Sequence, residues 1–206
     1  MTWTCRCENM VRKFAIIGHR APSSGKINLN DLPGSSGRID VLARAVNTAL
    51  FLSHGIREDT DLTLHLLGGP GPARRIWLDG SRIRGVYPDE RAIAGQIGKA
   101  LKEPSPAIGQ FTELHTGFWH SGGGIEQTIS EWKKEGVRIF VLDADGIPFS
   151  TKDHGSESVG FVLSDDQPFT EAESKCLDAF EKVSLGRTWL QGNACISILH
   201  HYLDLD

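Results

Sequence analysis

The hydrophobic positions of this chain form short apolar runs that alternate with amphipathic stretches. Runs typical of buried strands occur at residues 13–18, 61–67, 137–143, 158–164 and 182–185. Apolar residues recur at helical spacing in residues 38–54, 89–101, 124–136 and 193–203, and Thr170-x-x-Glu173 forms a capping box for a further helix to about residue 181. This alternation predicts an α/β fold in which helices cover both faces of a parallel sheet.

Turn residues divide these elements. Ser36 or Gly37 is the expected cap of the helix at residues 38–54, and Gly55 is its expected stop. The Asp79-Gly80 dipeptide lies between two apolar segments, residues 76–78 and 82–86, and predicts a hairpin, while the D-A-D-G sequence that begins at residue 143 predicts another turn. Residues 22–37 and 104–124 are rich in glycine, proline and serine, so we expect a long loop in the first and a mobile loop in the second.

The composition is that of an ordinary globular domain. Of the 206 residues, 39% are hydrophobic and 23% are charged, which excludes a coiled coil, a collagen-like rod and a disordered chain. No apolar run approaches the roughly 20 residues that cross a bilayer, and the first residues lack the apolar stretch of a secretory signal, so we expect a cytoplasmic protein without membrane contact. We interpret residues 1–10 as a disordered extension and residues 11–206 as one domain.

Charge and side-chain chemistry limit the possible partners. The net charge of −4 is divided unevenly, because residues 1–103 carry +5 and residues 104–206 carry −9. A basic first half is consistent with contacts to RNA phosphates, although scattered solvated charge produces the same asymmetry. The four cysteines are too few and too unevenly spaced for a disulfide framework or an all-cysteine zinc site, and the eight histidines show no metal-ligand spacing, so we expect no metal.

Familiar nucleotide and hydrolase motifs are absent from the sequence. It contains no G-x-x-x-x-G-K-[ST], no strand-anchored G-x-G-x-x-G and no G-x-S-x-G. Ligands of open parallel sheets bind beyond the carboxyl ends of the strands, and three such ends occur in the second half, at residues 142–143, 164–165 and 184–190. The third end leads into a small-residue and apolar loop that suits an adenosine-like ligand held by backbone groups. An ordinary loop that covers the core is the alternative.

Several ordered motifs together resemble a known family. They are L-x-D-L-P-G-S-S-G-R-I-D at residues 29–40, F-L-S-H-x-I-R-x-D at 51–59, P-D-E-R at 88–91, F-V-L-S-D at 161–165 and the ending S-L…C-I-S-I-x-H-x-Y-L-D at 184–204. From about residue 11 onward the chain resembles the archaeal tRNA pseudouridine-54 N1-methyltransferase family of the SPOUT superfamily. The resemblance implies a C-terminal trefoil knot, a homodimer with the active site at the subunit interface, S-adenosylmethionine (SAM) as cofactor and tRNA as substrate.

Other functions stay open beside this one. The related ribosomal-RNA pseudouridine N1-methyltransferases share the same superfamily and cofactor chemistry. A catalytically idle dimeric RNA-binding module and a small-molecule-binding α/β protein without transferase activity are alternatives from other classes. Binding of SAM is the property that separates these possibilities most directly.

The resemblance also implies which residues bind SAM. The matching positions lie at the three strand ends and at the start of the closing helix: Leu142, Ser164, Leu185, Gly186, Arg187, Thr188, Trp189, Leu190 and Cys195. Ser164 stands where a glycine is frequent, and Gly192-Asn193-Ala194 replaces a stretch that usually carries histidines. In the loop at residues 113–124, His115 and His120 stand where relatives tend to have arginines, which weakens the inference that this loop binds RNA.

Methyl transfer requires alignment of donor and acceptor and loss of a proton from N1 of pseudouridine, without a metal. A carboxylate near N1 and an arginine that holds the uracil ring or a phosphate supply these functions. Asp40 with Arg38 lies at one predicted helix start, and Asp89 with Arg91 lies at another. We expect Asp40 to act as base or orienting group and Arg38 to bind the substrate, with helix capping and a salt bridge as the alternative for each pair. Cys195 is expected to be a packing residue rather than a nucleophile.

Overall fold

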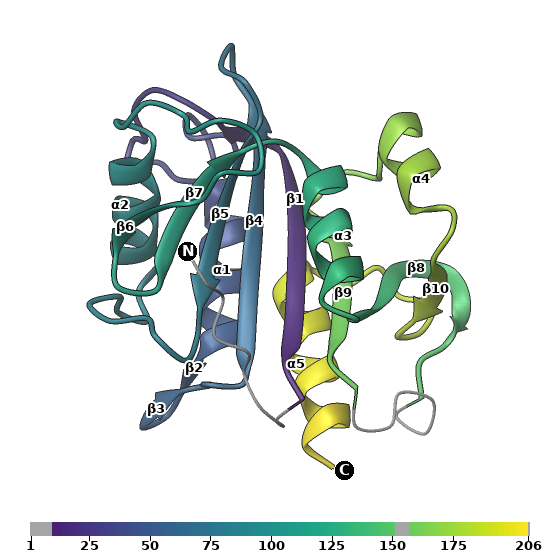
Figure 1. Cartoon of the computed structure of the whole chain (residues 1–206). Helices are drawn as coiled ribbons and strands as arrows, with labels where there is room; N and C mark the ends of the chain where they lie inside the picture. Colours follow the sequence, from purple (N-terminus) through teal and green to yellow (C-terminus); the bar gives the residue numbers. More distant parts are fainter. Residues whose placement is uncertain (1–9, 151–156, 206) are drawn as a thin grey trace.

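The computed structural model describes residues 10–150 and 157–205, and these form a mixed α/β fold around an eight-stranded sheet of order β10-β8-β9-β1-β4-β5-β7-β6 (Figure 1). Five neighbouring strands are parallel: β10(Glu181–Ser184), β8(Arg138–Pro148), β9(Val159–Ser164), β1(Arg12–Pro22) and β4(Thr60–Gly68). The strands predicted at residues 13–18, 61–67, 137–143, 158–164 and 182–185 are all confirmed. Their carboxyl ends lie at one edge of the sheet, where the predicted ligand-binding ends meet.

The other end of the sheet is antiparallel, so the predicted parallel sheet is confirmed for five of the eight strands only. β5(Arg74–Asp79) pairs antiparallel with β4 and with β7(Phe118–Gly122), and β7 pairs antiparallel with β6(Thr112–His115). Residues 112–122 therefore form a hairpin within the segment at residues 104–124 where we expected a loop. Residues 82–86 do not form the predicted second strand of a hairpin, because β7 occupies the edge of β5 and Ile83 is buried in the core instead.

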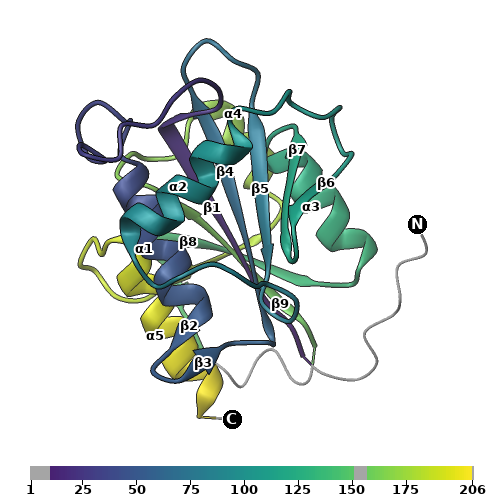
Figure 2. The ribbon, with the colours of Figure 1, turned by 90° about the vertical axis from the view of Figure 1, so that its left-hand side faces the viewer.

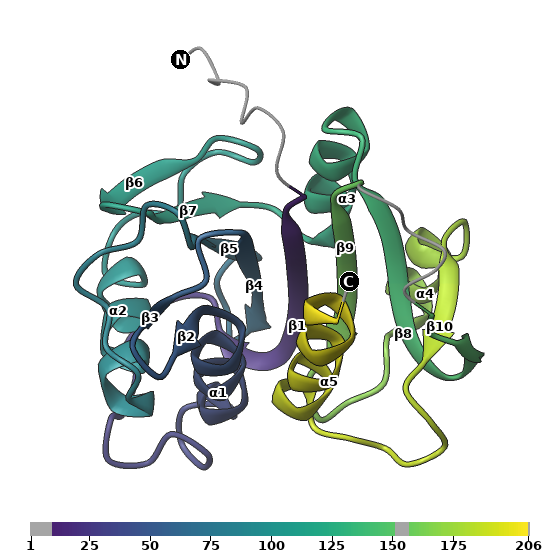
Figure 3. The same ribbon diagram turned by 90° about the horizontal axis from the view of Figure 1, so that it is seen from below.

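Helices cover both faces of the sheet, as predicted. One face is covered by α1(Ile39–Leu50), α2(Glu90–Ala100) and α5(Gly192–Asp204), and the other by α3(Ile125–Lys134) and α4(Glu171–Leu177) (Figures 2 and 3). Alternate residues of β1 serve the two cores, with Phe14 and Ile16 packed beneath α1 and α5, and Ala15 and Ile17 packed beneath α3. No helix in the described ranges is long and apolar enough to span a membrane.

The ends of several elements differ from the predictions for local reasons. α1 begins after Arg38, which has a left-handed φ of 63° and makes no side-chain cap, so neither Ser36 nor Gly37 is the cap. The helix stops at Leu50 rather than at residue 54, because β2(Phe51–Leu52) and β3(Gly55–Ile56) form a small hairpin. β8 continues through the predicted D-A-D-G turn because its last residues pair with β10.

The predicted capping box of α4 is confirmed, and Asp89 makes the helix cap that was the alternative to its catalytic role. The Asp89 carboxylate accepts a hydrogen bond from the amide of Ala92 at 2.8 Å, which caps α2. Thr170 and Glu173 form the capping box of α4, although that helix ends at Leu177 because the chain soon enters β10. The extension predicted for residues 1–10 lies, apart from residue 10, outside the described residues.

Candidate functional site

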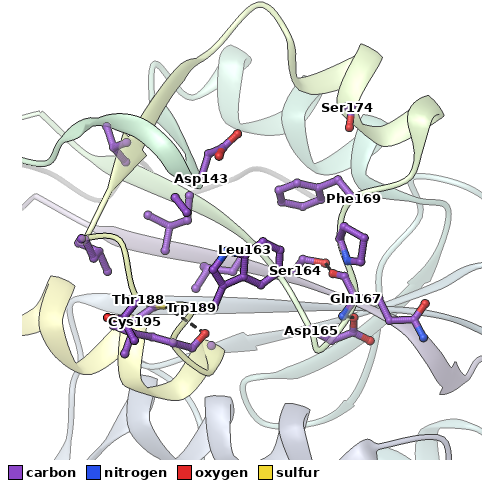
Figure 4. A pocket seen from close by; sticks show the side chains of 18 residues that line it. Asp143, Leu163, Ser164, Asp165, Gln167, Phe169, Ser174, Thr188, Trp189 and Cys195 are labelled. Atoms are coloured by element: carbon purple, nitrogen blue, oxygen red, sulfur yellow. Dashed lines mark hydrogen bonds between the residues drawn. The ribbon is translucent and has the colours of Figure 1, made fainter.

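A cavity of about 330 Å³ lies at the carboxyl ends of β9 and β10 and beside residues 142–144 within β8 (Figure 4). The three strand ends predicted from the sequence meet there. Eight of the nine residues that the resemblance implies for SAM binding line this cavity: Leu142, Ser164, Leu185, Gly186, Thr188, Trp189, Leu190 and Cys195. The ninth, Arg187, does not line it. The described lining residues include Asp143 and Asp165 but no lysine or arginine, so the formal charge of the lining is negative.

The loop between β10 and α5 is shaped by small residues and one serine. The Ser184 hydroxyl accepts a hydrogen bond from the amide of Gly186 at 3.1 Å and donates to the Ala144 carbonyl oxygen at 3.1 Å. Gly186 has a φ of 118°, a conformation that residues with a Cβ rarely adopt. At the far end of the loop, a Cβ on Gly192 would lie 2.9 Å from Cδ1 of Ile16, so glycine lets α5 begin close against the sheet.

The opposite wall of the cavity comes from the segment between β9 and α4, most of which the sequence reasoning missed. Gln167, Pro168 and Phe169 line the cavity beyond the strand end (Figure 4). The Ser164 hydroxyl donates to the carbonyl oxygen of Gln167, and the Asp165 carboxylate accepts from the Gln167 amide at 3.0 Å. The only sequence signal was the run of polar residues directly after the strand, which is too common to identify a binding wall.

His19 forms hydrogen bonds with residues at both ends of this wall. Its Nδ1 lies 2.8 Å from Oδ1 of Asp165, its Nε2 lies 3.0 Å from Oε2 of Glu173, and its backbone amide donates to Asp165 at 2.9 Å. The hydrogen bond with Asp165 is the largest contribution that raises the pKa of His19 from 6.5 to about 9, and Glu173 adds to it against the effect of burial. The imidazolium therefore links β1 to both ends of the wall, a role that the sequence did not indicate.

Cys195 lies at the first turn of α5 and faces the cavity. Its Sγ is 4.0 Å from the carbonyl oxygen of Leu190, and burial raises the pKa of the thiol. A thiol with a raised pKa stays protonated at neutral pH and is a poor nucleophile. This environment fits the predicted packing role.

Asp40 is a buried carboxylate that is already shared between two arginines. It accepts from Nε of Arg38 at 3.0 Å, from Nη2 of Arg38 at 3.3 Å and from Nη2 of Arg44 at 2.7 Å. Burial raises the pKa of Asp40, but the hydrogen bonds from Arg38 and Arg44 outweigh it and hold the pKa below its usual value. Both oxygens of Asp40 are thus occupied, and the carboxylate orients Arg38.

The two predicted catalytic pairs have different surroundings. Arg38 donates from Nη1 to Asp166 at 3.2 Å, and Asp166 directly follows the lining residue Asp165, so this pair is connected to the cavity wall. Asp89 caps α2, and Arg91 donates to the side-chain oxygen of Asn30 at 3.1 Å. None of these four predicted catalytic residues lines the cavity.

Comparisons with known proteins show the family to which this chain belongs. The family model described as putative SAM-dependent RNA methyltransferase matches residues 11–206. Two proteins named tRNA (pseudouridine(54)-N(1))-methyltransferase are 38% identical (Methanosarcina mazei, 91% of its length) and 40% identical (Haloarcula marismortui, 96% of its length), each covering 94% of this chain. In fold, the chain is similar to Archaeoglobus fulgidus Nep1 bound to S-adenosylhomocysteine, with a TM-score of 0.64, 14% identity, and coverage of 96% of this chain and 98% of that one. This chain therefore belongs to the family of putative SAM-dependent RNA methyltransferases.

Proposed function

We propose that this protein transfers a methyl group from SAM to N1 of pseudouridine 54 in tRNA. The observation that carries the proposal is the 38% identity, across 94% of the chain, with an enzyme named for this reaction. The position of the cavity supports it, because the residues expected to bind the cofactor lie together although they are distributed over more than 50 positions of the sequence.

The chemistry of the cavity fits SAM. Leu142, Leu163 and Leu185 supply apolar surface for a flat adenine ring, and a volume of about 330 Å³ falls within the range of small-molecule sites. The Asp143 carboxylate suits a ligand that carries a cationic sulfonium and an ammonium group, whereas the Asp165 carboxylate is already paired with His19. When bound, SAM supplies an electrophilic methyl group, and the cavity residues Leu142, Ser164, Leu185, Gly186, Thr188, Trp189, Leu190 and Cys195 would hold it by packing and backbone contacts.

Arg38 and Asp40 prepare the acceptor side. The two hydrogen bonds that Arg38 donates to Asp40 fix the plane of its guanidinium group, so that Arg38 can hold the uracil ring or an adjacent phosphate. We assign Asp40 the role of orienting Arg38, because a carboxylate whose oxygens are both engaged by arginines is a weak base. Asp89 and Arg91, which lie outside the cavity, are proposed as secondary contacts to the RNA.

The knot and the homodimer implied by the resemblance are part of the same proposal. The fold similarity covers almost the entire chain, and the loop between β10 and α5 leaves apolar side chains exposed, with Trp189 78% and Leu190 38% accessible. A second subunit that covers these residues would close the cavity rim. Sedimentation at micromolar concentration with SAM present tests the dimer, and a monomer under those conditions would contradict it.

Mass analysis of RNA tests the reaction itself. A tRNA carrying pseudouridine 54 is incubated with the protein and SAM, and the expected product is one added methyl group at that base. A control transcript with uridine at position 54 should stay unmodified, because uridine has no free N1–H. Methylation of a ribosomal-RNA pseudouridine instead of the tRNA would favour the related ribosomal enzymes, and binding of tRNA without any methylation would favour an idle RNA-binding module.

A further inference from the structure

Two arginines from different parts of the chain converge on one carboxylate beside the cavity. Arg20 in β1 donates through Nη2 to Oδ2 of Asp166, and Arg38 donates through Nη1 to the same oxygen at 3.2 Å. We call Arg20 and Arg38 the arginine fork. Since Asp166 directly follows Asp165 of the cavity wall, the fork lies next to the candidate cofactor site.

The backbone segments that carry Arg20 and Arg38 are packed closely together. Gly37 and Arg38 have φ angles of 62° and 63°, and a Cβ on Gly37 would lie 2.0 Å from the carbonyl oxygen of Arg20. Within residues 10–150 and 157–205, Arg38 is the only residue other than glycine with a positive φ. Backbone strain of this kind persists where the surrounding structure imposes it, and it is concentrated at binding and catalytic sites.

The Asp166 side chain is held less firmly than the backbone of the segment that contains it. The amide of Asp165 donates to the Ile17 carbonyl oxygen at 3.0 Å, and His19 holds the Asp165 side chain, so the wall has its own anchors. The side chains of Asp166 and Arg20 are 29% and 47% accessible to solvent. Exposed ion pairs contribute little to stability, so the Asp166 side chain can leave the fork while the wall stays in place.

We propose that the arginine fork binds a phosphate group of the RNA backbone, and that Asp166 occupies this site in the free protein and is displaced by RNA. The proposal rests on the proposed function, which supplies RNA as the ligand. Guanidinium groups bind carboxylates and phosphates through the same paired N–H donors. Asp40 retains its hold on the opposite edge of Arg38, so displacement of Asp166 frees Nη1 of Arg38 and the whole Arg20 guanidinium for the phosphate.

The first test measures tRNA affinity of the protein saturated with S-adenosylhomocysteine, over a range of salt concentrations. Asp166→Asn removes the competing charge at constant size, and we expect it to bind tRNA roughly two- to fivefold more tightly than the wild type. Arg20→Gln should bind more weakly, with the slope of log affinity against log salt reduced by up to about one. Asp178→Asn is the matched control, since Asp178 is 73% accessible and pairs only with Lys182 at 3.6 Å among the described residues.

A second test uses inorganic phosphate as the probe and needs no RNA. At constant ionic strength, rising phosphate should increase the melting temperature of Asp166→Asn more than that of the wild type or of Asp178→Asn. The double variant Asp166→Asn with Arg20→Gln should lose this added stabilisation. If the wild type does not methylate tRNA, the proposed function fails, and the phosphate titration still decides the fork.

Two results would overturn the fork proposal. One is equal tRNA affinity and equal phosphate response in Asp166→Asn and Asp178→Asn. The other is a joint loss of tRNA and S-adenosylhomocysteine affinity in Asp166→Asn, which would make Asp166 a brace of the cavity wall and not an occupant of a phosphate site.

Discussion

The ionic contacts of His19 predict that the free energy of unfolding of this protein depends on pH between about 6.5 and 9. The groups that face the ring are the carboxylates of Asp165 and Glu173, at 2.8 and 3.0 Å. They raise the pKa of His19 from 6.5 in the unfolded chain to about 9 in the folded one. A raised pKa means that the folded protein holds the proton more tightly than the unfolded chain does. The stabilisation is therefore complete below pH 6.5, declines between pH 6.5 and 9, and is absent above that range.

The structure sets the size of the effect. A pKa difference between 6.5 and about 9 corresponds to at most roughly 3 kcal/mol. The His19 side chain is 10% accessible, and screening by solvent reduces this value, so we expect about 1–2 kcal/mol. In a domain of about this size each kcal/mol shifts the melting temperature by roughly 2–4 °C. The proton-linked part of the His19 contacts therefore amounts to about 2–8 °C.

The test compares the wild type with His19→Gln by thermal unfolding from pH 6 to pH 9.5. Glutamine keeps a donor and an acceptor but carries no charge, so the variant should melt lower at pH 6, and the gap should narrow by about 2–8 °C towards pH 9.5. His54→Gln, at an exposed position between β2 and β3, is the control and should show no such narrowing. A gap between wild type and His19→Gln that is the same at every pH would refute the assignment of His19 as an imidazolium between two carboxylates.

Three further predictions concern the cavity and the arginines. Gly186→Val should lower SAM affinity at least tenfold in calorimetric titration, because a φ of 118° is strained for valine, although a Cβ at this position meets no atom within 4 Å. The control Gly95→Ala, on α2, should bind SAM as the wild type does. Trp189→Ala should weaken SAM binding only a few-fold, since this side chain is 78% accessible, and a complete loss of binding would contradict a peripheral position. Asp40→Asn should keep SAM affinity but slow single-turnover methylation of tRNA by roughly 10²-fold, and wild-type turnover would make Asp40 a purely structural residue.

The sequence predicted the parallel half of the sheet well because its strands are buried on both faces. The runs that became β1, β8 and β9 hold nearly continuous apolar segments, and the run that became β4 alternates leucine with polar residues, so each pattern predicts a strand. The antiparallel half was missed because β6 and β7 carry polar side chains such as Thr112, Glu113 and Ser121 and lie between glycines. Their pairing depends on the edge offered by β5, which is a tertiary property that no local pattern contains.

The candidate site was predictable where it follows from topology and was not predictable where it follows from ion pairs. Strand ends that run parallel must meet at one edge, so the cavity position could be inferred from three apolar runs. His19 and Asp165, or Arg20 and Asp166, are each 146 positions apart, and many other charged residues were equally plausible partners. The αL conformation of Arg38 was also hidden, because a residue with a Cβ seldom adopts it.

These long-range pairs connect the cavity wall and Arg38 to the same end of β1. β1 supplies His19 and Arg20 in succession, and the wall supplies Asp165 and Asp166 in succession, so one strand end is bound twice to the same segment. The first contact is buried and holds the residue that lines the cavity, whereas the second is exposed and is shared with Arg38. Burial makes the first contact costly to break and solvent makes the second easy to exchange. Asp165 can therefore stay in place in the cavity wall while the side chain of Asp166, the next residue, is displaced by a phosphate of the RNA.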